Sequence, residues 1–160
     1  MDAVDKIIAQ WKTERPDLDT RSMGLIGRMK RLSTHVTQSM EKTLLRHGLT
    51  LPGFDVLATL RRSGPPFQLS PGDLLATMMI ASGTMTNRID QLEKTGLIER
   101  IKNPDDGRSV LIKLTDKGLQ VIEAAVTDHV KTLNKLTSNL SGDDFQALDT
   151  LLAKFLRDFE

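Results

Sequence analysis

Apolar residues recur along this chain mainly at intervals of three or four, the spacing of one face of an α-helix. The first long stripe runs from Thr20 to about Arg46, and Gly48 follows it at a position typical of a helix C-terminus. Two further long stripes begin after Thr115 and Ser141, which are both suitable N-cap residues. The pattern therefore predicts a mainly helical protein with long helices towards both ends.

Between these stripes, caps and helix breakers predict three shorter helices. Thr50 precedes a helix with proline in its first turn, and Gly64 begins the Gly-Pro-Pro run that stops it. Ser70 can cap a helix of about ten residues. Ser82 can cap the next, which extends to Lys94 before a stop at glycine. The last two short helices therefore follow one another across a tight turn.

A β-hairpin is expected directly after these helices. Residues 97–101 and 109–114 are apolar and rich in β-branched side chains, and a polar string with proline and glycine joins them. A short helix, a turn, a second helix and a hairpin is the order in which the second helix enters a major groove. The hairpin can then reach the neighbouring minor groove or the DNA backbone. The predicted fold class is mainly α with a small β-hairpin, as a winged helix-turn-helix.

The side chains left over from the apolar stripe of the second short helix are short or planar hydrogen-bonding groups. Such groups suit base edges and phosphates. The predicted DNA-contacting residues are Ser82, Thr84, Thr86, Asn87 and Arg88 on the helix, with Lys102 and Arg108 on the hairpin. The alternative is that these residues only cap and solvate a surface helix. The hairpin and the order of the elements favour the interpretation that these residues contact DNA.

Composition excludes several classes of function. The chain has no cysteine, so it has neither disulfides nor thiolate metal sites. Its histidines, His35, His47 and His129, are scattered without a carboxylate or nucleophile at motif spacing, so no enzyme, metal site or cofactor is predicted. No apolar run approaches the roughly 18 residues of a membrane span, so a cytoplasmic protein is expected. The net charge of +1 is too small to indicate nucleic-acid binding by itself.

Two motifs resemble those of the MarR family of bacterial transcriptional regulators. The run from Ser82 to Ile98 is similar to its recognition helix, and residues 106–109 and 114–118 are similar to its wing and wing exit. The resemblance covers essentially the whole chain, residues 1–160. It implies a DNA-binding lobe over 50–116, with dimerisation helices over 1–47 and 117–160. It also implies that Arg108 enters the minor groove and that Asp106 braces the wing by pairing with Arg108.

Dimerisation is also indicated by the helical stripes. The first, fifth and sixth helices counted from Thr20 carry more apolar surface than a small winged-helix core needs to cover. A two-fold homodimer would bury that surface and present two recognition helices to a palindromic operator in double-stranded DNA. The alternative is a closed monomeric bundle built from the same helices.

Within the family, a smaller group responds to urate or related purines, and this chain resembles it at Trp11, residues 15–19, Asp55, Asp73 and Arg88. The resemblance implies that these residues bind the effector. An indole can stack on a flat heterocycle, a guanidinium can pair with its anionic edge, and carboxylates can accept its ring N–H groups. Capture of Arg88 by an anion would shift the recognition helix and release DNA, as expected of a ligand-responsive repressor.

Each of these residues also has a purely structural interpretation. Asp55 and Asp73 lie near helix starts, where carboxylates act as caps and interact with the helix dipole. Arg88 could bind phosphate, and Trp11 could close an N-terminal helix over the core. Two functional alternatives stay open. The effector could be a phenolic or other aromatic acid, or the winged helix could be a protein-interaction module that does not bind DNA.

Overall fold

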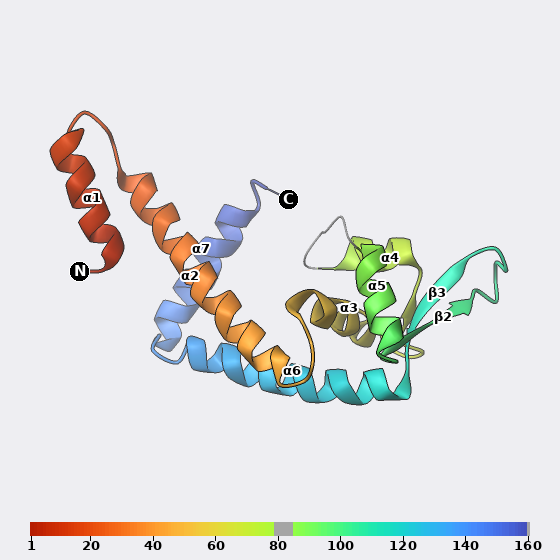
Figure 1. Cartoon of the computed structure of the whole chain (residues 1–160). Helices are drawn as coiled ribbons and strands as arrows, with labels where there is room; N and C mark the ends of the chain where they lie inside the picture. Colours follow the sequence, from red (N-terminus) through yellow and green to blue (C-terminus); the bar gives the residue numbers. More distant parts are fainter. Residues whose placement is uncertain (79–84, 160) are drawn as a thin grey trace. The chain divides into compact units, whose positions relative to one another are not determined.

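A computed structural model describes residues 1–78 and 85–159. The chain divides into two compact units, unit 1 (residues 1–39) and unit 2 (residues 40–160). The elements are α1 (Ala3–Glu14), α2 (Arg21–Leu45), α3 (Leu51–Arg62), β1 (Gln68–Leu69), α4 (Pro71–Thr77), α5 (Met85–Lys94), β2 (Ile98–Lys102), β3 (Val110–Leu114), α6 (Asp116–Leu136) and α7 (Gly142–Leu156) (Figure 1). The predicted fold class is confirmed, because helices dominate and the strands form one small antiparallel sheet.

Four helices of unit 2, α3, α4, α6 and α7, begin where a side-chain cap satisfies a free backbone N–H group. In each case a hydroxyl oxygen accepts a hydrogen bond from the backbone N–H three residues on. The caps are Thr50 (3.2 Å), Ser70 (3.1 Å), Thr115 (3.0 Å) and Ser141 (3.1 Å). The cap predicted at Ser82 lies outside the described residues, as does Thr84. Four of the five helix starts predicted from caps are therefore observed.

The core of unit 2 lies beneath α3. Leu57 and Leu60 of α3, Ile112 of β3 and Ile122 of α6 are fully buried, and Leu74 of α4 joins them. Ile89 and Leu92 attach α5 to the same cluster. The winged helix therefore shares one continuous core with the beginning of α6.

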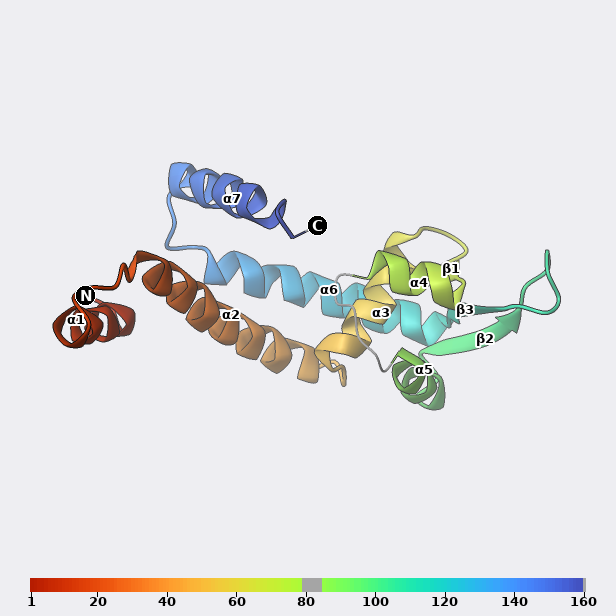
Figure 2. The same ribbon diagram turned by 90° about the horizontal axis from the view of Figure 1, so that it is seen from above.

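The sheet has the strand order β1-β3-β2. Strands β2 and β3 pair from Ile98↔Leu114 to Lys102↔Val110, and the loop between them extends well beyond the helices (Figure 2). Strand β1 was not predicted, because a two-residue strand has no alternation of its own and is defined only by pairing with β3. Helix α4 has seven residues instead of about ten, since Met78 is already extended.

Unit 1 is held together by charge pairs and by close packing of α1 on the first part of α2. Arg28 forms ion pairs with Asp2, at 2.7 Å, and with Asp5. A Cβ atom on Gly27 would meet Val4 at 3.4 Å, so the glycine lets the two helices approach closely. Among the helices described, none is long and apolar enough to span a bilayer.

Candidate nucleic-acid interface and effector residues

Helix α5 is the second helix of the predicted helix-turn-helix, and the burial of its apolar face determines which of its side chains remain exposed. Ile89 and Leu92 are buried, whereas Thr86 and Asn87 are exposed in the first turn. In helix-turn-helix proteins the N-terminal residues of this helix contact base edges. Thr86 and Asn87 are thus accessible for that role, while Ser82 and Thr84 lie outside the described residues.

Arg88 behaves differently from its neighbours on α5. Its side chain is half-buried, and its Nη1 atom is buried with no hydrogen-bond partner among residues 1–78 and 85–159. A buried guanidinium N–H without an acceptor is costly, and carboxylate or phosphate oxygens are its strongest partners. Arg88 is therefore a position at which an anion would be stabilised.

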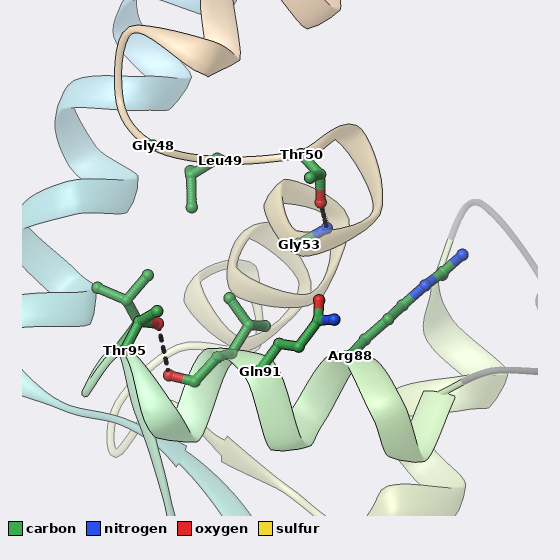
Figure 3. Close-up of a pocket in the computed structure, with 9 residues that line it drawn as sticks. Gly48, Leu49, Thr50, Gly53, Arg88, Gln91 and Thr95 are labelled. Carbon is green, nitrogen blue, oxygen red and sulfur yellow. Dashed lines mark hydrogen bonds between the residues drawn. The ribbon is translucent and has the colours of Figure 1, made fainter.

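Arg88 also borders a small cavity between α5 and the turn that joins α2 to α3 (Figure 3). The cavity has a volume of about 150 Å³. Its lining residues are Gly48, Leu49, Thr50, Gly53, Arg88, Gln91, Leu92, Thr95 and Leu97. A dry cavity of about this volume can hold a single aromatic ring. In Figure 3, Gln91 projects from α5 towards the α3 side of this space.

The wing residues lie at the tip of the hairpin. Lys102 and Arg108 are exposed, as a contact with phosphate or with the minor groove requires. The Asp106 carboxylate accepts a hydrogen bond from the backbone N–H of Arg108 at 3.1 Å, and its carbonyl accepts one from the Ser109 N–H at 2.9 Å. Asp106 thus closes the turn through the backbone, and the Arg108 guanidinium forms no ion pair with it in the described part of the chain.

One ion-pair cluster was not identified from the sequence. Arg100 of β2 donates to Asp90 of α5 at 2.5 Å and also to Glu93. Hydrogen bonding to Asp90 raises the pKa of the Arg100 guanidinium above its ordinary value. The two acidic residues are three positions apart on one helix, a spacing that puts them on one face. No local sequence pattern identifies the arginine on the following strand as their partner.

The other three predicted effector residues do not line the cavity that Arg88 borders. Asp55 of α3 is buried, with 6% of its surface exposed. Asp73 is exposed and takes part in the cap of α4, where its carboxylate accepts the Ser70 hydroxyl at 2.7 Å. Trp11 belongs to unit 1, is 39% exposed and borders a surface hollow with Gln10, Thr13 and Glu14. Convergence of Trp11 with the residues of unit 2 stays a prediction.

The string of residues 15–19 forms local ion pairs. Arg15 holds Asp17 in a two-point contact at 2.7 and 2.6 Å. Hydrogen bonding from Arg21 lowers the pKa of Asp19 to about 2. Both carboxylates therefore form ion pairs with nearby arginines in and beside the loop between α1 and α2.

The sequence of this chain is similar to those of known transcriptional regulators. Residues 49–110 match the model of the MarR family. The chain is 38% identical over 151 residues to the HTH-type transcriptional regulator PecS of Dickeya dadantii, covering 94% of this chain and 91% of that protein. It is 33% identical over 109 residues to the multiple antibiotic resistance protein MarR of Escherichia coli, covering 68% and 74%.

Solved structures show the same fold. A putative MarR-like transcription regulator from Bacillus cereus superposes with a TM-score of 0.78 at 21% identity, covering 89% of this chain and all of that one. A mutant of E. coli MarR in complex with operator DNA superposes with a TM-score of 0.73 at 27% identity, covering 86% and 97%.

Proposed function

The chain belongs to the MarR family of DNA-binding transcriptional regulators, and from this premise we propose that it is a homodimeric repressor that a small aromatic anion releases from a palindromic operator. The observation that carries the proposal is the position of Arg88. This residue lies on the proposed recognition helix, and one of its guanidinium nitrogens is buried with no acceptor in the part of the chain that the structure describes. An anion that binds Arg88 therefore acts directly on the element that reads DNA.

DNA recognition is assigned to α5 and the wing. Thr86 and Asn87 contact base edges from the exposed first turn of α5, together with Ser82 and Thr84. Lys102 and Arg108 contact the backbone or the minor groove from the hairpin. The complex of E. coli MarR with operator DNA supports this assignment, because that protein shares the fold at 27% identity.

The proposed homodimer rests on apolar surface that the single chain leaves uncovered. None of residues 142–156 of α7, all of which the structure describes, is buried. The exposed apolar side chains of this helix are Phe145, Leu148, Leu151, Leu152, Phe155 and Leu156. A surface of this kind is unfavourable in water, and a second copy of the chain in two-fold symmetry would cover it.

A purine such as urate is the proposed effector. It would pair its anionic edge with Arg88, stack on Trp11 and donate ring N–H groups to Asp55 and Asp73. A phenolic acid is the second candidate, because the 150 Å³ cavity beside Arg88 has the size of one aromatic ring.

Fluorescence titration tests the effector, since Trp11 is the only tryptophan. Urate, xanthine and salicylate are titrated in separate experiments, and release of a labelled duplex is followed in parallel. We expect saturable quenching by a purine, release of DNA over the same concentrations, and loss of both responses in Arg88→Gln but not in the control Arg31→Gln. Responses to salicylate alone would identify the second candidate. If no compound has any effect, the proposed effector site is wrong, while DNA binding is judged separately by mobility shift.

A further inference from the structure

We propose that Arg100 is a positioning residue for DNA recognition, which locks the recognition helix α5 to the wing by holding Asp90 and Glu93 at the same time. The proposal rests on the DNA binding of the proposed function but not on its effector. It assigns to Arg100, Asp90 and Glu93, hereafter the Arg100 clasp, a role in specificity.

The guanidinium of Arg100 contacts both carboxylates at once. Arg100 Nη2 lies 2.5 Å from Asp90 Oδ1, and Arg100 Nη1 contacts Glu93 Oε2. The backbone N–H of Arg100 also donates to Glu93 Oε1, at 3.3 Å. Asp90 and Glu93 are one helical turn apart, so a planar guanidinium that holds both fixes the rotation of α5 about its own axis.

Apart from the clasp, α5 is held by a narrow apolar face and by contacts at its C-terminal end. Its apolar face contacts the core mainly through Ile89 and Leu92, which form a narrow attachment along a ten-residue helix. Its C-terminal end is held by α6, because Thr115 donates to the Gly96 carbonyl at 2.7 Å and Lys117 to that of Thr95 at 2.8 Å. The Arg100 clasp adds a lateral contact along the second half of the helix. It therefore restricts the rotation that the apolar contact leaves free.

The wing is connected to the same ion-pair contact. Arg100 lies on β2, one of the two edge strands of the sheet, two residues before Lys102. The same clasp that orients α5 thus also fixes the strand leading to the tip of the wing. Base contacts from Asn87 and backbone contacts from Lys102 are then held in one register.

Arg100 also neutralises negative charge on α5. Asp90 and Glu93 are acidic residues on a helix that approaches phosphates, so as independent surface charges they would weaken DNA binding. The guanidinium between them offsets that charge. Exposed ion pairs contribute little to stability, and these three side chains remain 32 to 45% exposed. The clasp is therefore expected to affect specificity much more than it affects folding.

The test uses a duplex that the wild-type protein selects from a randomised library and a scrambled duplex of the same length. The double variant Asp90→Asn/Glu93→Gln should bind the selected duplex about tenfold more weakly, with affinity for the scrambled duplex unchanged or raised. The control Glu99→Gln removes the same kind of charge from an exposed residue of β2 outside the clasp. It should leave the affinity for the selected duplex unchanged or slightly raised. If the double variant binds the selected duplex as tightly as wild type or more tightly, the proposal is overturned.

Arg100→Lys separates positioning from simple charge. Lysine keeps the positive charge but cannot bridge two carboxylates as a planar fork does. We expect weaker binding to the selected duplex with an unchanged salt slope, and wild-type affinity would contradict the clasp. A lower salt slope in the neutral variant Arg100→Met would instead show that Arg100 contacts phosphate directly, and would contradict the clasp.

A measurement without DNA keeps the two proposals distinguishable. Amide hydrogen exchange in residues 85–94 should rise about tenfold in Arg100→Met and in the double variant, while exchange in α3 stays at the wild-type level. Unchanged exchange in α5 would overturn the clasp even if wild type binds DNA. If wild type selects no duplex, the DNA-binding function fails, and the exchange data still decide whether the clasp holds α5.

Discussion

The Cα atom of Gly118 lies so close to Leu97 that a Cβ atom added there would be 1.9 Å from the Leu97 carbonyl oxygen. The start of α6 is thus in direct contact with the backbone that follows the recognition helix. Hydrogen bonds from Thr115 and Lys117 to the same segment strengthen this contact. If α6 is a dimerisation helix, as proposed, we expect this junction to transmit changes between the dimer interface and α5.

Substitution of Gly118 tests the junction. Gly118→Ala should lower the free energy of unfolding by about 2–3 kcal/mol, because a methyl group has no space beside a rigid backbone carbonyl. Urea unfolding followed by circular dichroism measures the change. Gly142→Ala is the matched control, since no atom lies within 4 Å of an added Cβ there, and it should be neutral or slightly stabilising. Equal stabilities for the two variants would contradict the close contact.

The wing should contribute to affinity through charge. Arg108 is exposed at the tip, so Arg108→Ala should weaken binding to all sequences and reduce the slope of log K against log salt by about 1. Fluorescence anisotropy at several salt concentrations measures both quantities. Arg31→Ala removes the same charge from an exposed position on α2, and should leave the slope unchanged. Wild-type affinity for Arg108→Ala would exclude the wing contact.

The effector residues should be separable from the DNA-contacting residues. Trp11→Phe and Asp73→Asn should leave DNA binding nearly intact and abolish release by the effector, because neither residue belongs to the groove-facing set. The amide oxygen of asparagine can still accept the hydroxyl of the cap residue Ser70, so Asp73→Asn should also fold normally. Mobility shift with and without urate measures both properties. If either variant loses DNA binding alone, its assignment to the effector site is wrong.

His129 should make stability depend on pH. Its ring lies against Phe54, with the centroids 4.7 Å apart, and burial lowers the pKa of the imidazole below 6.5. The unfolded chain therefore binds more protons in this range, so stability is retained above about pH 6.5 and falls as pH decreases towards the folded pKa. His129→Leu should reduce the difference in urea midpoint between pH 7.5 and pH 5.5. An unchanged difference would mean that another group is responsible.

The exposed face of α7 should determine the oligomeric state. Leu148→Glu/Leu152→Glu places two charges on this face and should reduce the sedimenting mass from twice 17.8 kDa to a single chain. Thr150→Glu, on the same helix outside the apolar set, is the control and should remain dimeric. A wild-type chain that sediments as a monomer would contradict the proposed dimer.

Features with local causes could be predicted from the sequence. Thr50 and Ser141 are visible as caps because a cap acts on the next three residues, and Gly48 and Gly96 have the positive φ values of helix ends, 69° and 73°. The apolar stripe of α3 likewise identifies Leu57 and Leu60 as core residues.

Features that depend on residues distant in the sequence could not be predicted. Strand β1 exists only through its pairing with β3, and the contact between Gly118 and Leu97 joins segments that carry no common pattern. The Arg100 clasp links a strand to the preceding helix through side chains that look like ordinary surface charges. Of the candidate site, the first turn of α5 and the wing tip were predictable. The burial of Arg88 Nη1 without an acceptor among the described residues depends on packing between elements and was not predictable.

Selection from a duplex library with a randomised central region shows whether the chain is a homodimer that reads DNA through α5. Two recognition helices related by two-fold symmetry should enrich an inverted repeat whose half-sites are about 10 base pairs apart. Addition of the effector should then release the enriched duplex. Failure to enrich any sequence, or enrichment of a single asymmetric site, would contradict a homodimer that reads DNA through α5.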